Sequence, residues 1–304
     1  MFLAVTATCC GEGEGELSAL PPVEEQPRET RTYAGTLVFQ SDRNGAWDIY
    51  RMDADGTELA RLTEDPAADR NPAWSPDGQT IVFSSERTGA GDIYVMDADG
   101  DNERRVTDHP AYEGAPRFTP DGEAIVFEGE RDGRAEIYRV DLESGAVKRL
   151  TASVQRKLGP AYSPDGRTLA FMEKSLIRWH ISVRDEGSGK KRAVTGGGGA
   201  CRPAWSPDGR LLAFVSTRET DKADLWFREM QGEREGSAWR VPTRANAHNY
   251  DPAFSPDGSS LAMASTLVRG DNEQWDIFVM DINGRGLVAL TGGEGNERFP
   301  DWRP

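Results

Sequence analysis

The sequence predicts an all-β protein, a six-bladed β-propeller with four strands in each blade, from three observations. A motif of Pro, any residue, an aromatic residue, Ser or Thr, and then Pro-Asp-Gly recurs at spacings between 43 and 49 residues. Each repeat holds four short apolar runs separated by turn residues. A truncated last copy of the motif lies at the C-terminus, and the first repeat lacks that same portion. A period of about 40–50 residues indicates one repeat architecture rather than separate domains.

The motif predicts a tight turn in every repeat. Its clearest copy is residues 71–78, and the complete copies carry Trp74, Phe118, Tyr162, Trp205 and Phe254 in the aromatic position. In Pro-Asp-Gly the proline fixes φ and the glycine accepts a positive φ, as such a turn requires. We therefore interpret the recurring aspartates as turn residues rather than as a catalytic set; they are Asp77, Asp121, Asp165, Asp208 and Asp257.

The repeat over residues 72–107 shows the expected strands most clearly. They cover residues 72–75, 80–85, 92–97 and 103–107. These runs are short, rich in β-branched and aromatic residues, and bounded by Gly, Pro and Asp, which is typical of strands. Four strands in about 44 residues are typical of one propeller blade.

The two ends of the chain are predicted to share a blade. Complete repeats begin near Pro72, Pro116, Pro160, Pro203 and Pro252. Before them lie second, third and fourth strands, at 36–41, 47–53 and 59–63, without a first strand. Residues 299–304 supply that strand, so the first blade is completed by the C-terminal strand. A blade built from both ends closes the ring and leaves no free edge between the first and last blades.

Composition excludes several classes of partner. The 304-residue chain carries a net charge of −15. This argues against nucleic acid, which needs a basic face, and against direct binding to anionic lipid. The cysteines are Cys9, Cys10 and Cys201, which form neither a disulfide framework nor a metal-ligand spacing. We predict no metal and no cofactor.

The N-terminal residues predict export rather than part of the fold. Residues 1–10 are small and apolar up to Cys9-Cys10, like a truncated signal or lipoprotein segment with lipidation at Cys9. Residues 11–34 are acidic and almost without apolar side chains, so we expect a disordered linker. The propeller would then cover residues 35–304. We expect a monomer in the periplasm or on the extracellular face of a bacterial envelope, touching the membrane only through the lipid anchor.

The repeats resemble the TolB-like propeller family with its WD40-like Pro-Asp-Gly repeats. The resemblance rests on the Trp-Ser-Pro-Asp-Gly turns, on second strands such as Ile81–Phe83, and on third strands such as residues 92–100, and it extends from Thr36 to Pro304. It implies an envelope protein that binds other proteins at the mouth of its channel. Residues 1–34 are too short and polar for the α/β domain of TolB, so we expect a free-standing propeller. Related propellers are fused to peptidases or act as metal-dependent pectate-fragment lyases.

Two sets of repeated charges are predicted to be structural. An acidic residue precedes the third-strand aliphatic residue in most blades, and the set is Asp48, Asp92, Glu136, Asp224 and Asp276, with His180 in the fourth blade. Repetition in almost every blade favours a structural hydrogen bond. The second strands end in Asp42-Arg43, Glu86-Arg87 and Glu130-Arg131, for which we expect exposed pairs of little energetic value.

The loops that enter the first strands differ from blade to blade, so a specific site is predicted there. The candidate partner-binding residues at the channel mouth are Arg70, His109, Tyr112, Glu113, Lys157, Arg202, His248, Tyr250, Asp251, Glu297 and Arg298. Neither a Gly-x-Ser-x-Gly elbow nor a His-Glu-x-x-His motif is found. We therefore predict a non-catalytic protein that binds a protein or peptide. The alternatives are a propeller-type lyase or hydrolase, and glycan binding in the channel.

Overall fold

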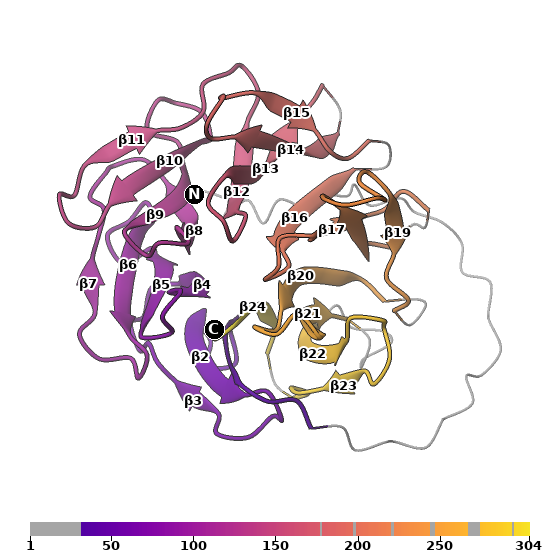
Figure 1. The fold of residues 1–304 in the computed structure, drawn as a ribbon. Coiled ribbons are helices and arrows are strands. Elements are labelled where there is room, and N and C mark those ends of the chain that lie inside the picture. The colour runs from indigo at the N-terminus through magenta and orange to yellow at the C-terminus, as the bar shows by residue number, and fades with distance from the viewer. Residues whose placement is uncertain are drawn as a thin grey trace.

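Six sheets form the molecule. The computed structural model describes residues 32–176, 178–196, 199–219, 222–243, 247–266, 274–293 and 295–304. Over these ranges the chain forms six four-stranded sheets arranged in a ring (Figure 1). This confirms the predicted six-bladed all-β propeller. The predicted lipidation at Cys9, the segment 1–10 and residues 11–31 of the predicted linker lie outside the described residues.

Within each blade the strands run from innermost to outermost in the following order. Blade 1 consists of β24 (Glu297–Trp302), β1 (Thr36–Ser41), β2 (Asp48–Asp53) and β3 (Ala60–Arg61). Blade 2 consists of β4 (Asp69–Trp74), β5 (Thr80–Ser85), β6 (Asp92–Asp97) and β7 (Arg104–Arg105). Blade 3 consists of β8 (Glu113–Phe118), β9 (Ala124–Gly129), β10 (Glu136–Asp141) and β11 (Val147–Arg149).

Blades 4 to 6 repeat this order. Blade 4 consists of β12 (Lys157–Tyr162), β13 (Thr168–Lys174), β14 (Trp179–Asp185) and β15 (Lys191–Ala193). Blade 5 consists of β16 (Ala200–Trp205), β17 (Leu211–Ser216), β18 (Asp224–Glu229) and β19 (Ala238–Arg240). Blade 6 consists of β20 (Asn249–Phe254), β21 (Ser260–Ser265), β22 (Asp276–Asp281) and β23 (Val288–Ala289).

The shared blade is confirmed. Strand β24 pairs with β1 in antiparallel register, with Leu37 opposite Trp302 and Val38 opposite Asp301. The indole N–H of Trp302 donates to the carbonyl of Ala34 at 3.2 Å, and the N–H of Arg303 donates to the carbonyl of Thr36 at 2.8 Å. The ring therefore closes through backbone pairing inside blade 1.

Apolar cores fill the spaces between neighbouring blades. One core joins Val38 and Ile49 of blade 1 to Trp74 and Phe83 of blade 2. In each of the first five blades the second strand contributes one fully buried phenylalanine; these are Phe39, Phe83, Phe127, Phe171 and Phe214. Full burial of such a side chain contributes about 1.5–3 kcal/mol. Among the described residues no helix is long and apolar enough to cross a membrane.

The inner strands begin earlier than predicted, and each contains a β-bulge. Strand β4 starts at Asp69, whereas residues 72–75 were expected, and its register with β5 shifts between Arg70 and Ala73. The cause is the proline that follows, because it has no N–H to give to the ladder. The residue before that proline has a φ between 47° and 57° in every blade; the six are Asn71, Ala115, Gly159, Arg202, Asp251 and Phe299.

Candidate functional site: the central channel and its mouth

The six inner strands surround one central cavity. It encloses about 270 Å³ and is lined by the six bulge residues and by several of the prolines and aromatic residues that follow them. A bulge turns its residue out of the regular alternation of the strand. The repeated bulge therefore delivers one non-repeated residue from each blade to the channel, which gives a symmetric fold an asymmetric site.

Three charged residues form the main polar cluster of the channel. Asp251 is buried, and its two carboxylate oxygens lie 3.2 Å from Nε of Arg202 and 2.7 Å from Nε of Arg298. Burial opposes the ionisation of Asp251, but the charges of Arg298 and Arg202 outweigh it and hold its pKa below the ordinary value. Asp251 is therefore ionised at neutral pH, and the cluster carries two positive charges against one negative charge.

Aromatic rings fix the two guanidinium groups of this cluster. The guanidinium of Arg202 lies 4.4 Å from the ring centre of Phe299. The guanidinium of Arg298 lies 4.2 Å from the ring centre of Trp275 and 5.3 Å from that of Tyr250. Stacking of this kind holds an arginine in one orientation. The cluster is thus an ion-paired wall of the channel whose two guanidinium groups are held by aromatic rings.

A second carboxylate faces the channel from blade 1. Asp301 accepts a hydrogen bond from the backbone N–H of Trp74 at 2.8 Å. Burial raises the pKa of Asp301, although the charge of Arg117 opposes the shift. Arg117 itself donates to the carbonyl of Pro72 at 3.0 Å. These two residues link blades 1 and 3 to the inner strand of blade 2.

The mouth of the channel carries an exposed tyrosine. Tyr112 is 40% exposed, and its hydroxyl lies over Gly114, where a Cβ atom would come within 2.1 Å of it. Burial of its hydroxyl end and the charge of Glu128 raise the pKa of Tyr112, so the hydroxyl remains a hydrogen-bond donor at neutral pH. Arg70 lies nearby, 3.6 Å from Glu86 and with its guanidinium 5.1 Å from the ring centre of Trp47.

Two of the predicted mouth residues lie inside their blades. Glu113 is buried and pairs with Arg131, and Glu297 is buried and pairs with Arg43 at 3.0 Å. Arg87 pairs in the same way with Asp69 at 3.0 Å. The expectation that these arginines form exposed pairs with their neighbours in sequence was therefore wrong. Each reaches the buried acid that begins the inner strand of its own blade.

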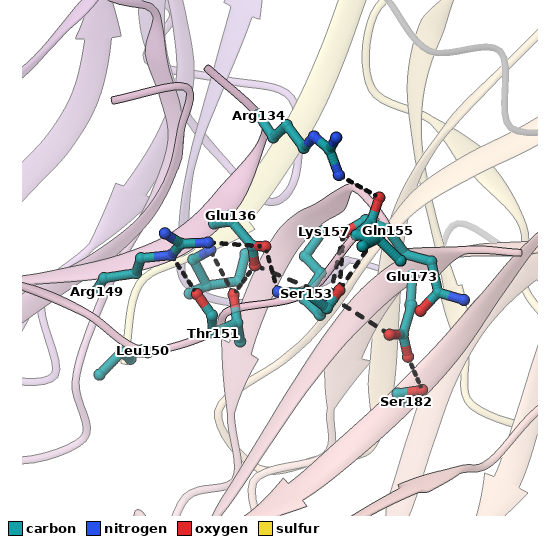
Figure 2. Close-up of polar contacts among 12 residues, drawn as sticks. Arg134, Glu136, Arg149, Leu150, Thr151, Ser153, Gln155, Lys157, Glu173 and Ser182 are labelled. Carbon is teal, nitrogen blue, oxygen red and sulfur yellow. Dashed lines mark hydrogen bonds and ion pairs between the residues drawn. The ribbon is translucent and has the colours of Figure 1, made fainter. Parts of the chain in front are cut away.

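Lys157 takes the same position in blade 4 with the opposite charge. It is buried, 3.4 Å from Glu173 and 3.8 Å from Glu136 (Figure 2). Glu173 also accepts from Lys191 at 2.5 Å and from Ser182 at 2.9 Å. Burial opposes ionisation of Glu173, but these donors and Lys157 hold its pKa below the ordinary value. In blade 4 the basic residue therefore begins the inner strand and the acid lies in the second strand, whereas in blades 1 to 3 the acid begins the inner strand.

Four of the five predicted third-strand acids pair with the fourth strands, as the prediction of a structural role requires. The carboxylate of Asp48 lies 2.9 Å from Arg61, that of Asp92 lies 2.7 Å from Arg105, that of Glu136 lies 3.2 Å from Arg149, and that of Asp224 lies 3.2 Å from Arg240. These pairs join the third strand to the short outermost strand in blades 1, 2, 3 and 5, whereas Asp276 of blade 6 accepts a hydrogen bond from the hydroxyl of Thr291 at 3.4 Å.

The two predicted histidines stabilise loops, and the second tyrosine is buried. Nδ1 of His109 accepts from the N–H of Ala111 at 3.1 Å, and Nδ1 of His248 accepts from the N–H of Ala223 at 3.3 Å. Tyr250 packs edge-on against Trp275 with ring centres 5.4 Å apart. Among the described residues, no three His, Cys, Asp or Glu side chains are grouped to hold a metal ion.

The structure thus divides the eleven predicted residues into groups. It brings together Arg202, Asp251 and Arg298 at the channel, with the buried Tyr250 packed against Arg298, and it places Arg70 and Tyr112 at the mouth. Glu113, Lys157 and Glu297 lie within blades, and His109 and His248 lie in loops on the same face. Sequence reasoning missed Arg117 and Asp301, which follow the first proline of the motif where the other copies have Ala. The replacement of this Ala by Arg or Asp was the signal that could have identified the two residues.

Comparison with known proteins agrees with this architecture. A family model described as the TolB beta propeller domain matches residues 33–107, 70–238 and 200–304. TolB from Acinetobacter baumannii is 25% identical with a TM-score of 0.77, over 90% of this chain and 68% of that chain. A putative TolB from Agrobacterium tumefaciens is 21% identical with a TM-score of 0.66, over 86% and 90%.

An enzyme also shares the fold. An oligogalacturonate lyase in complex with manganese is 17% identical with a TM-score of 0.51, over 85% of this chain and 74% of that chain. At this identity the likeness concerns the fold alone. No curated protein matches the sequence at a significant level.

Proposed function

Because the chain belongs to the TolB β-propeller family, we propose that it is a non-catalytic cell-envelope protein that binds a protein or peptide at the mouth of its channel. The observation that carries this proposal is the repeated bulge, which brings six different residues to one cavity. A cavity of about 270 Å³ accommodates a few side chains of a partner. It is therefore suited to anchoring a protein whose main contact lies on the surrounding face.

The chemistry of the mouth supports recognition of a protein. Tyr112 is a partly exposed aromatic residue, and tyrosine and arginine are enriched among the residues that dominate protein interfaces. Arg202 and Arg298 are held in fixed orientations by Asp251 and by aromatic rings. A preorganised wall of this kind reduces the entropy lost on binding.

The cellular setting is part of the same proposal. We place the protein in the periplasm or on the outer face of a bacterial envelope, as a monomer held to the membrane by lipidation at Cys9. The support is the family and the apolar segment before Cys9-Cys10. Labelling of the protein with a palmitate analogue in cells, compared with Cys9→Ser and Cys10→Ser variants, tests the anchor.

Site-specific cross-linking tests partner binding at the mouth. A photoreactive phenylalanine analogue would replace Tyr112 in one protein, and Leu59 in a matched control. Leu59 is 47% exposed and lies in the β2–β3 loop, on the opposite face. Irradiation of envelope preparations should give a discrete protein adduct from position 112 and none from position 59. Identical adducts from both positions, or none from position 112, would refute binding at the mouth.

A further inference from the structure

Blade 4 has the opposite charge to the rest of the molecule. Residues 152–195 contain nine Lys and Arg against four Asp and Glu, whereas the whole chain has 36 against 51. Four of the six lysines of the chain fall in this segment. Part of the charge serves the fold, since Lys157 and Lys191 pair with Glu173. The remainder makes this blade a basic sector of an acidic protein.

Two aliphatic side chains protrude from loops beside this basic sector. Val154, in the β11–β12 loop, is 81% exposed, and Leu176, in the β13–β14 loop, is 100% exposed. Aliphatic side chains this exposed are costly to solvate, and neighbouring ones mark interaction sites. Both loops lie on the face that carries Tyr112, because they enter an inner strand or leave a second strand.

Two backbone hydrogen bonds and an ion pair join these loops into one surface that reaches the channel mouth. The N–H of Lys174 donates to the carbonyl of Arg156 at 3.1 Å, which sets the two loops side by side. Arg156 pairs with Glu130 at 2.7 Å, and the N–H of Glu130 donates to the carbonyl of Tyr112 at 2.9 Å.

Basic side chains surround the two aliphatic ones. Arg134 crosses from blade 3 to the carbonyl of Val154 at 3.1 Å (Figure 2). Lys174 and Arg178 are exposed on either side of Leu176. We name this surface the blade 3–4 patch; it consists of Arg134, Val154, Arg156, Lys174, Leu176 and Arg178.

We propose that the blade 3–4 patch is a docking surface for a protein segment that presents aliphatic or aromatic side chains flanked by Asp and Glu. This deepens the proposed function, on which it rests, because the patch extends from the mouth to one side of the ring. Apolar contact with Val154 and Leu176 supplies buried area. The cations select a partner of opposite charge and exclude basic segments.

A protein segment fits this surface better than a lipid surface does. An anionic membrane is extended, so the whole molecule with its net charge of −15 would be repelled. A single acidic segment meets only the patch, where the local sign is positive. The partner is therefore defined by its chemistry as acidic and apolar, and it approaches off-centre over blades 3 and 4.

Selection of displayed peptides tests this chemistry without knowledge of the natural partner. Random peptides on phage would be selected against the immobilised full chain and sequenced. We expect enrichment of peptides with Asp or Glu next to Leu, Phe or Trp, and binding at least about tenfold weaker to Leu176→Glu. The Lys174→Glu/Arg178→Glu variant should show a similar loss. Leu59→Glu and Arg167→Glu/Lys190→Glu are matched controls on the opposite face and should bind like the wild type.

Several outcomes would overturn the proposal. Enrichment of basic peptides, no enrichment, or equal binding to Leu176→Glu and Leu59→Glu each contradict an acidic, apolar partner on this patch. Retention of the wild type by phosphatidylglycerol vesicles, with loss in Leu176→Glu, would assign the patch to a membrane instead. Matched melting temperatures exclude unfolding as the cause. If position 112 gives an adduct and any of these results is also obtained, the proposal of binding at the mouth stands and only the proposal for the blade 3–4 patch is rejected.

Discussion

At the scale of single residues, the exchanged charges of blade 4 show how a repeat tolerates variation. In blades 1 to 3 a buried acid begins the inner strand and an arginine after the second strand pairs with it. In blade 4 a lysine begins the inner strand and the acid, Glu173, lies next to the end of the second strand. The interaction is retained although both residue types have changed, so the constraint applies to the pair and not to either position.

Replacement of Lys157 by Met should destabilise the protein strongly. The change leaves Glu136 and Glu173 buried with one cation fewer, and loss of one partner of a buried pair costs about 3–5 kcal/mol. Unfolding in urea at neutral pH measures the loss. The double variant Lys157→Met/Glu173→Gln should recover part of it, because a buried negative charge is removed. A loss below about 1 kcal/mol in the single variant would show that Lys157 acts like a surface ion pair.

Asp301 should make stability fall as pH rises. Burial raises its pKa, so the folded chain holds this proton more tightly than the unfolded chain. The stability that this proton provides is present below the ordinary pKa and is lost as the pH rises through the higher folded-state pKa. Asp301→Asn removes the titration and keeps an acceptor for the N–H of Trp74. Its unfolding free energy relative to wild type should therefore increase between about pH 4 and about pH 7.

The opposite sign is expected at a turn aspartate, which serves as the control. Hydrogen bonds from Ser255 and from the N–H of Ser259 lower the pKa of Asp257. Its stabilising contribution is present above the ordinary pKa and is lost on acidification. Asp257→Asn should therefore lose stability relative to wild type as the pH rises to about pH 5 from below the ordinary pKa, a lower range than that of Asp301. Urea titrations of both variants at several pH values decide the matter, and equal slopes would contradict the assignment.

At the scale of elements, the bulge before each proline determines what the channel contains. The position adopts a positive φ in all six inner strands, yet only Gly159 is a glycine. A residue with a Cβ atom pays about 1–2 kcal/mol in this conformation. The other five positions retain side chains in spite of this cost, and two of them, Arg202 and Asp251, form the channel cluster. Strain at these positions is consistent with a site that is selected for binding.

Ala115 is the bulge residue whose side chain can be removed with least loss of contact, so it measures the strain. Ala115→Gly should raise the free energy of unfolding by about 0.5–1 kcal/mol, because glycine accepts a positive φ without the Cβ clash. Gly159→Ala is the reciprocal control. It should lower stability, since φ is 57° and its Cβ would lie 3.2 Å from the sulfur of Met172. Thermal unfolding tests both, and a destabilised Ala115→Gly would contradict strain at the bulge.

The same bulge explains what the sequence could and could not predict. The turns, the second and third strands and the closing strand follow from proline, glycine and apolar alternation, and they appear as predicted. The starts of the inner strands were placed too late, because residues such as Asp69 and Arg70 are polar and precede a bulge. The fourth strand of blade 2 spans only Arg104–Arg105, because just two of its residues pair with β6.

The sequence predicts which residues lie near the channel mouth, but it does not predict which residues they pair with. Loop variation selected Arg202, Asp251 and Arg298, which the structure places together beside the channel because all six inner strands meet there. It could not distinguish Glu113 and Glu297 from them, because the arginines that pair with these acids follow the second strand of the same blade. In blade 1 that strand lies at the other end of the chain, and Arg43 pairs with Glu297 across 254 residues.

At the scale of the whole molecule, the location of the chain ends stabilises the ring. The chain passes covalently from each blade to the next, including from blade 6 into β24 of blade 1. The two ends meet inside blade 1, where β24 pairs with β1. An opening of the ring at any blade interface is therefore resisted by the backbone itself, in addition to the apolar contacts between blades.

Two circular permutants separate this effect from packing. In both, Trp302 is joined to Thr36 through a copy of the Ser75–Gln79 turn, which completes blade 1 in one piece. The first permutant begins in the loop before β4, near Ala67, so each blade is continuous and no chain crosses between blades 1 and 2. The second begins at Gln79 and ends at Gly78, so the ends meet inside blade 2 and every interface is crossed.

We expect the second permutant to match the wild type in melting temperature and the first to melt lower and unfold faster. Both should bury the same side chains, since the strands and their order around the ring are unchanged. In the first permutant the interface between blades 1 and 2 can open without breaking any strand pairing. In the second the chain joins all neighbouring blades, so opening any interface requires breaking strand pairing inside blade 2. Urea unfolding rates measured by tryptophan fluorescence give the comparison. Equal rates for both would mean that contacts between blades alone hold the ring, and that the shared blade reflects only where the repeat happens to begin.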